Sequence, residues 1–309
     1  MATRLYAMAM GQPVLYLVIG VIAITTILII PVTNAFSVTT ENPSFTNNNN
    51  ASKTSLLLNT ISQRLNNTIA NLMGIAEASM NRSNSFGKLP QAKLTSDIKI
   101  KFHGIPSDQE LEKRIEAKVL LANNKALLYV GLLLPNGDRY FGEPYYPYQT
   151  NSSVTNFAYK DHFIGALKTK QPYLSNVFKA VTTGQPLAIL ASPIYADVKN
   201  HQSLIGVQVL GLNFSYFNDL VKSIMPPTIE ASNIKRIVLV DNNGTGVADS
   251  SFDNKNKTTE SFKNLQSFQN AKNGETGSLT ENVNGKNMLV SYTPIKFAQT
   301  RWIALLFSC

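Results

Sequence analysis

The sequence has little of the chemistry from which metal sites and common catalytic sites are built. Its single cysteine, Cys309, excludes a disulfide within the chain and a cysteine metal site. The three histidines, His103, His162 and His201, are far apart, and none has the HExxH spacing of a zinc protease. Nucleophile elbows (GxSxG) and phosphate-binding loops do not occur either. We therefore expect no metal, no cofactor and no catalytic residue, and predict that the chain is not an enzyme.

Basic runs are also lacking, although the chain is cationic. The 28 Lys and Arg residues exceed the 19 Asp and Glu residues, which gives a formal net charge of +9. These cations are scattered, and no basic stretch alternates with aromatic residues as a nucleic-acid-binding surface would. Net charge alone informs on solubility and association. We expect no nucleic-acid partner.

Charged residues are missing from the N-terminal region between Leu5 and Thr40. An apolar stretch of this length crosses the roughly 30 Å of a bilayer core as a helix. We predict a cytoplasmic N-terminus at residues 1–12 and one transmembrane signal anchor at residues 13–35, oriented by Arg4 under the positive-inside rule. The membrane is then a partner of a single-pass cell-membrane protein whose residues after the anchor are extracellular. The alternative is a signal peptide cleaved near Ala35.

Asparagine is abundant after this segment. Residues 36–51 are polar and include the run Asn47–Asn50, which predicts a linker. Seven Asn-x-Ser/Thr sequons support export, because such sites are glycosylated only on an exported surface. They begin at Asn50, Asn66, Asn81, Asn151, Asn213, Asn243 and Asn256.

A long amphipathic helix is predicted over Ser55–Asn81. Its apolar residues recur at steps of three and four and form one stripe. The stripe consists of Leu58, Ile61, Leu65, Ile69, Leu72, Ile75 and Ala78. It could pack against the protein's own sheet or against a second copy, and we predict a homodimer through this helix.

Strands dominate the sequence after residue 126, because short apolar runs are bounded by Pro, Asn and Gly. The predicted strands are Leu127–Leu134, Arg139–Phe141, Leu187–Ala191, Leu204–Leu212, Arg236–Val240, Gly277–Asn282, Met288–Pro294 and Trp302–Phe307. The predicted helices are Asp108–Leu121 with Ser107 as its N-cap, Tyr216–Ile224 and Ser261–Asn270. Pro226-Pro227 predicts a hinge.

Two parts of the chain follow the same order of strand, turn, loop, helix and meander. The first turn reads PNGD and the second DNNG. We predict an α+β fold in which the long helix carries two tandem modules with antiparallel sheets. The first module, with the helix, spans residues 52–225, and the second spans residues 226–309.

These blocks, in this order, resemble the double Cache (dCACHE) extracellular sensor domain. They are the long helix, YVGLLLPNGDRYFG, NFAYKDHF, QPYLSNVF, LAILASPIY and LIGVQVLGLNFSYF, then IVLVDNNGTGVADS, NGETGS, VNGKNMLVSYTPI and RWIALL. The resemblance covers about residues 52–309. It implies two PAS-like modules on a long helix outside the membrane, of which the membrane-distal one binds a small ligand. It also implies a cytoplasmic or membrane signalling partner.

The resemblance places the ligand site within residues 156–213. Where amino-acid-binding members carry Arg-x-Trp-Tyr, Tyr-x-Asp and a final Asp, this sequence has Lys160, His162, Phe163, Tyr173, Ser175 and Asn213. Only the tyrosine matches, and the two carboxylates that would hold an ammonium group are missing. The Asn-Phe-x-Phe-Arg-x-Tyr-Phe run of dicarboxylate-sensing relatives is closer to Asn156, Phe157, Tyr159, Lys160, His162 and Phe163.

A cation retained without these carboxylates favours a small carboxylate or another small polar anion as the ligand. The predicted ligand-binding residues are Tyr129, Asn156, Tyr159, Lys160, Asp161, His162, Tyr173, Ser175 and Asn213. Two alternatives stay open. Lys160 and Asp161 form an ordinary surface ion pair, or Asn213 carries a glycan, which a buried ligand contact would prevent.

We therefore predict the small-molecule-sensing input domain of a transmembrane signal-transduction protein, such as a chemotaxis receptor. The sequons and the richness in asparagine suggest an archaeal cell surface. No second span or effector follows Cys309, so the sequence is truncated or the output lies in a partner protein. The alternative function is a membrane-anchored surface binding or adhesion protein without signalling output.

Overall fold

A computed structural model describes residues 48–225, 234–251 and 260–308. Residues 44–309 form one compact unit. The predicted anchor at residues 13–35, most of the predicted linker and the Pro226-Pro227 hinge lie outside the described residues. Among the residues that are described, no helix combines the length and the apolar character needed to cross a bilayer.

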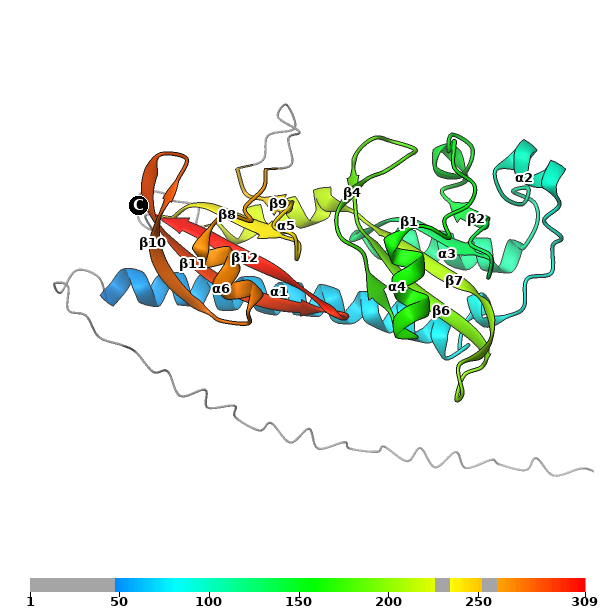
Figure 1. Ribbon diagram of the computed structural model, residues 1–309, viewed down its shortest axis with the longest axis horizontal. Coiled ribbons are helices and arrows are strands. Elements are labelled where there is room, and N and C mark those ends of the chain that lie inside the picture. Colours follow the sequence, from blue (N-terminus) through cyan, green and yellow to red (C-terminus); the bar gives the residue numbers. More distant parts are fainter. Residues whose placement is uncertain (1–47, 226–233, 252–259, 309) are drawn as a thin grey trace, which may run out of the picture. The chain divides into compact units, whose positions relative to one another are not determined.

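Helix α1 (Asn48–Met80) is the long helix expected from the sequence, and it begins inside the asparagine run assigned to the linker (Figure 1). Its apolar stripe is buried from Leu58 to Leu72. Beyond that point the buried residues are Ala76 and Ser79, because a straight helix drifts relative to a regular repeat. The stripe packs against strands and a helix of the same chain. A dimer through this stripe is therefore a wrong expectation, since the protein's own sheets cover it.

The first module, which we call the distal module, contains a five-stranded antiparallel sheet. Its strand order is β2 (Arg139–Glu143), β1 (Leu127–Leu133), β7 (Gln202–Leu212), β6 (Ile189–Asp197) and β3 (Tyr173–Leu174). A separate hairpin joins β4 (Phe178–Lys179) to β5 (Pro186–Leu187). The helices besides α1 are α2 (Ser96–Phe102), α3 (Leu111–Asn123) and α4 (Asp161–Thr169), with single turns at Ser85–Gly87 and Tyr145–Gln149.

The second module, which we call the proximal module, has its own five-stranded antiparallel sheet. Its strand order is β9 (Gly246–Asp249), β8 (Ile234–Val240), β12 (Thr300–Ser308), β11 (Lys286–Phe297) and β10 (Gly277–Val283). Helix α5 (Phe214–Ile224) precedes this sheet, and α6 (Gln266–Lys272) lies between β9 and β10 in the chain.

The two sheets are repeats of one topology, as expected for two tandem modules. Counted within each sheet, the strands follow the order second, first, fifth, fourth, third in both modules. The turns match as well. Gly137 and Gly244 both have positive φ, and each accepts a hydrogen bond of 2.7 Å, from Phe157 and Phe262 respectively. A side chain at Gly137 would meet the backbone of Ala158 at 2.5 Å, so this close return of the chain requires glycine.

Each sheet is covered on both faces. One apolar cluster runs along α1 and includes buried residues of both modules, from Leu132 and Leu210 to Trp302 and Leu306. Trp302 packs edge-on against Phe217 and Phe297, with ring centres 5.1 and 5.0 Å apart, and is a buried core residue. Separate apolar clusters lie on the opposite faces, where α4 covers the distal sheet and α6 covers the proximal sheet.

Two helices begin later in the structure than the sequence predicts. Helix α3 begins at Leu111 instead of Asp108, and the residue before it is Glu110 with a left-handed backbone, so Ser107 is not its N-cap. Helix α6 begins at Gln266, because Ser261 pairs with Thr245 in a β-bridge and extends the chain there. Helix α2 and helix α4 were not predicted.

The burial of α1 makes a testable prediction. Leu65 is fully buried between the helix and the sheets, so Leu65→Ala removes apolar contacts and leaves a cavity. We expect the free energy of unfolding to fall by about 2–5 kcal/mol, measured by chemical denaturation. Leu56→Ala, on the same helix but 67% exposed, serves as the control and should change it by less than about 0.5 kcal/mol. Equal losses in both variants would contradict this packing.

Candidate functional site

A small cavity of about 60 Å³ lies in the distal module on the side of the sheet that faces α4. Strands β1, β2, β6 and β7, the start of α4 and the β4–β5 hairpin supply its lining. The lining residues are Tyr129, Leu133, Arg139, Tyr148, Phe157, Lys160, His162, Phe178, Ala180, Val181, Thr182, Leu187, Ile189 and Val209. Two of these side chains, Arg139 and Lys160, are cationic, and none is a carboxylate.

Arg139 is the most buried charge of this cavity, with 2% of the residue exposed. Its guanidinium donates to the carbonyls of Tyr148, Gln149 and Val154 and to the Ser152 hydroxyl, at 2.9–3.2 Å. These neutral acceptors fold the loop after β2 around the guanidinium. Burial lowers the pKa of Arg139, and among the described residues no carboxylate lies within ion-pair distance of it. The buried charge is solvated by dipoles but is not neutralised.

Lys160 is the residue immediately before the first turn of α4 and has an extended backbone. Its ammonium lies 5.0 Å from the ring centre of Tyr159 and 5.7 Å from that of Phe178, as in cation–π contacts. Within the described ranges it forms no ion pair. Its neighbour Asp161 instead accepts hydrogen bonds from the Tyr173 hydroxyl and the Asn176 amide. A surface ion pair between Lys160 and Asp161 is therefore not what the structure shows.

His162 is 4% exposed and stacks on Phe178, with ring centres 6.0 Å apart and planes inclined by 22°. Burial lowers the pKa of His162 to about 4, with Lys160 adding to this effect and Asp161 opposing it. The imidazole is therefore neutral at physiological pH and contributes an aromatic wall with one N–H donor.

Tyr129 rises from β1 into the same cavity. Its hydroxyl lies against two glycines, and a methyl group on Gly131 or Gly142 would come within 2.5 or 2.6 Å of it. Burial raises the pKa of Tyr129, so the phenol stays protonated and can donate a hydrogen bond. Its ring packs against Tyr148 at 5.7 Å. Both tyrosines, His162 and Lys160 can present donors to a ligand, which suits an acceptor such as a carboxylate. Arg139 contributes its positive charge, because its four terminal N–H groups already donate within the protein.

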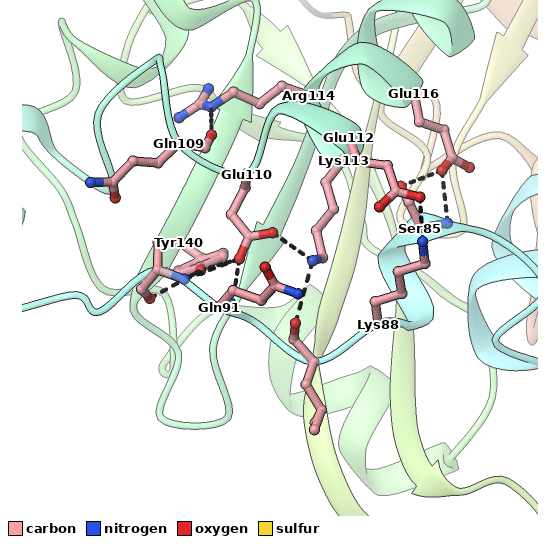
Figure 2. Close-up of polar contacts among 12 residues, drawn as sticks. Ser85, Lys88, Gln91, Gln109, Glu110, Glu112, Lys113, Arg114, Glu116 and Tyr140 are labelled. Carbon is pink, nitrogen blue, oxygen red and sulfur yellow. Dashed lines mark hydrogen bonds and ion pairs between the residues drawn. The ribbon is translucent and has the colours of Figure 1, made fainter.

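Strand β2, which carries Arg139, is fixed from the other side by a polar network on α3 (Figure 2). The Tyr140 hydroxyl donates to Glu110 at 2.5 Å, and Lys113 pairs with the same carboxylate at 2.6 Å. Burial would raise the pKa of Glu110, but these bonds and two backbone amides bring it down to about 2. Arg114 forms a buried ion pair with Glu143 at 2.6 Å. The charged side chains on this side of β2 are therefore paired with opposite charges. The charge of Arg139, on the cavity side, has no such partner among the described residues.

The structure brings three of the nine predicted ligand-binding residues together in this cavity, namely Tyr129, Lys160 and His162. Asp161 and Tyr173 bond to each other at 2.9 Å outside its lining, and Tyr159 is 61% exposed. Asn156 closes the β1–β2 turn by donating to Asp138 at 2.8 Å. The Ser175 hydroxyl accepts from the Ile189 amide at 3.0 Å. Whether these residues contact a ligand stays a prediction.

Asn213 lies elsewhere, at the start of α5. Its side chain accepts from the Ser215 amide at 3.2 Å and donates to the Lys125 carbonyl at 2.9 Å, so it caps the helix. It lines a second, larger cavity of about 510 Å³ between the β4–β5 hairpin, α5 and β9. That cavity has the size of a typical ligand pocket, but its charged lining residues, Asp249 and Glu260, are paired with Arg236. The smaller cavity holds the unpaired cations, and we place the candidate site there.

The lining residues that were not predicted from the sequence include Arg139 and the aromatic residues Tyr148 and Phe178. Arg139 directly follows the PNGD turn, where a basic residue normally faces solvent. Every residue of β2 is buried, so both faces of the strand are covered. The usual alternation of apolar and polar residues, which would reveal a buried face, is therefore missing here. Helix α4 did leave a signal, because His162, Phe163, Ala166 and Leu167 recur at helical spacing.

The buried imidazole makes stability depend on pH. The folded pKa of His162 lies below its unfolded value, so the unfolded state binds more protons between about pH 6.5 and pH 4. Its contribution is therefore fully present above about pH 6.5 and is lost as the pH falls. We expect the wild type to lose about 2 kcal/mol more than His162→Phe between about pH 7.5 and pH 5, measured by urea denaturation.

The matched control is His201→Asn, because His201 is only half-buried and has a left-handed backbone that asparagine accepts. This variant should keep the pH dependence of the wild type. Identical pH profiles for the wild type and His162→Phe would show that His162 is not held neutral.

Comparisons with known proteins give the family. A family model described as Cache domain, of the dCache_1 type, matches residues 45–306. A comparison with curated proteins finds no match.

Several solved structures share the fold. The sensory domain of the Campylobacter jejuni chemoreceptor Tlp3, with isoleucine bound, is 16% identical with a TM-score of 0.56, covering 87% of this chain and 98% of that one. The ligand-binding domain of the Pseudomonas aeruginosa PAO1 chemoreceptor PctC, in complex with GABA, is 14% identical with a TM-score of 0.53, covering 84% and 100%.

An extracellular ligand binding receptor from Desulfohalobium retbaense is 17% identical with a TM-score of 0.53; the alignment covers 82% of this chain and 40% of that one. At these identities the solved structures show a common fold only. The family model shows the family itself, because it matches residues 45–306, which is most of the sequence. The chain belongs to the Cache domain family.

Proposed function

We propose that the protein is the extracellular small-molecule-sensing part of a membrane receptor, and that the distal cavity binds a small carboxylate or a similar small anion. The single observation that carries the proposal is the lining of this cavity, which combines Arg139 and Lys160 with no acidic side chain. A bound anion would neutralise a buried guanidinium that neutral groups only solvate.

The size of the cavity supports a ligand with few atoms. Its volume of about 60 Å³ is well below the several hundred Å³ of a typical ligand pocket. Isoleucine, which is bound in the Tlp3 structure, is larger than such a ligand. The positions that would hold an ammonium group are Ser175 and Asn213 here, and both side chains are used in backbone hydrogen bonds. A short monocarboxylate such as acetate therefore suits this site better than an α-amino acid.

The remaining parts of the receptor follow from the sequence. Residues 13–35 would anchor the protein in the cell membrane with the compact unit outside. A signalling partner would receive the output, in chemotaxis or another pathway, and this chain would have no catalytic role. A homodimer would use surfaces other than the buried stripe of α1, for example the polar face of this helix.

The proposal is tested by calorimetry and thermal shift on residues 44–309, which form one compact unit. We expect acetate or propionate to bind and to raise the melting temperature, and isoleucine and GABA to have no effect at equal concentration. Lys160→Met keeps the apolar stem and removes the charge, and should weaken acetate binding by about 10-fold or more, since a charged hydrogen bond contributes about 1.5–3 kcal/mol.

Lys168→Met is the matched control, because Lys168 lies on the same helix with an exposed side chain. It should leave acetate binding unchanged. Binding of amines in preference to carboxylates would overturn the anion assignment. A stable unit that binds none of these compounds would favour a surface binding protein without a small-molecule ligand.

A further inference from the structure

A short segment, residues 173–177, connects the two modules by hydrogen bonds. It begins with β3, the edge strand of the distal sheet, which pairs with β6 over Tyr173 and Leu174 only. The segment makes polar contacts with α4 on one side and with two turns of the proximal module on the other. It therefore lies between α4, which directly follows Lys160, and a sheet that contributes no residue to the lining of the distal cavity.

On the distal side, Asp161 in the first turn of α4 holds the segment at two points. One carboxylate oxygen accepts from the Tyr173 hydroxyl at 2.9 Å, and the other accepts from the Asn176 amide at 3.2 Å. The ring of Tyr173 also packs directly against α4, since a methyl group on Gly165 would come within 2.4 Å of it. A displacement of the start of α4 must therefore move this segment.

On the proximal side, Leu174 exchanges two hydrogen bonds with one side chain. Its amide donates to the Gln299 carbonyl oxygen at 3.1 Å, and its own carbonyl accepts from the Gln299 amide nitrogen at 3.0 Å. Gln299 lies in the turn that joins β11 to β12. The side-chain amide thus acts like one more residue of a β-ladder, which makes the contact directional.

A second contact reaches the neighbouring strand. The Asp241 carboxylate follows β8, and one oxygen accepts from the Val177 amide at 2.9 Å. Its other oxygen accepts from the amides of Asn243 and Thr245 at 2.9 and 2.8 Å, which shapes the β8–β9 turn. Strands β8 and β12 are adjacent in the proximal sheet, so both contacts arrive at the same part of it.

We propose that residues 173–177 form a coupling strand that transmits the position of α4 to the proximal sheet through Gln299 and Asp241. The proposal rests on the proposed function for its trigger, because a bound anion would draw Lys160, and with it the start of α4, toward the cavity. The coupling itself is a property of the contacts and exists without a ligand. The distal cavity and the proximal sheet are energetically linked if both shift the position of the same segment, residues 173–177.

The ligand-free test is hydrogen exchange measured by mass spectrometry on residues 44–309. The variants are Tyr173→Phe, which removes the bond to Asp161, Gln299→Ala, and the double variant. Tyr173→Phe should speed exchange at 234–240 and 297–303 in the proximal module by about 3-fold to 10-fold, the effect of losing one hydrogen bond. In the Gln299→Ala background the same substitution should have less than half of this effect on those residues.

The matched control is Gln202→Ala, at the exposed start of β7. It should leave the effect of Tyr173→Phe on the proximal module intact. If that effect is confined to residues 161–177, or if it is the same with and without Gln299, the coupling strand is refuted.

A second arm adds sodium acetate at a concentration that saturates the thermal shift. In the wild type, acetate should slow exchange in both modules, and in Gln299→Ala it should slow exchange mainly in the distal module. Equal protection of the proximal module in both proteins would also refute the coupling. If acetate does not bind at all, the proposed ligand class fails, and the ligand-free arm still decides on the coupling strand.

Discussion

The fold depends on one helix that serves two sheets. Helix α1 buries a single apolar stripe, and that stripe is part of one continuous core with residues from both modules. The strands that meet α1 come from both sheets and carry large apolar side chains on the side that the helix occupies. Both sheets therefore bury these side chains against the same helix. The modules are therefore held in common by a shared hydrophobic surface, and the polar contacts between them are added to this arrangement.

Much of this architecture can be read from the sequence, and the reasons are local. The stripe of α1 repeats over several turns, and the PNGD and DNNG turns fix where hairpins occur. The errors also have local causes. Helix α3 begins late because Glu110 takes a left-handed conformation stabilised by Tyr140 and Lys113, residues that the helix pattern does not include. Helix α6 begins late because Ser261 belongs to a bridge with a distant turn.

The candidate site is harder to predict, because its chemistry depends on which charges lack partners. Arg139 and Arg114 look alike in sequence, and both are buried. Arg114 meets Glu143, whereas Arg139 meets backbone carbonyls. No periodicity distinguishes these outcomes, since the partners come from loops whose paths are set by the whole fold. Lys160 was found because the family resemblance marks its position, and the burial of its neighbour His162 followed only from the structure.

The repeated topology has a consequence for where sensing chemistry can arise. Aligning the modules on their matching turns and helix starts places Gly246 where the distal module has Arg139, and Leu265 where it has Lys160. Ser267 takes the place of His162 by the same alignment. The proximal module thus has the same scaffold but lacks the two cations and the imidazole at the equivalent positions. A duplicated fold of this kind can carry a candidate ligand site in one module, while the other module shares the hydrophobic core and supports it mechanically.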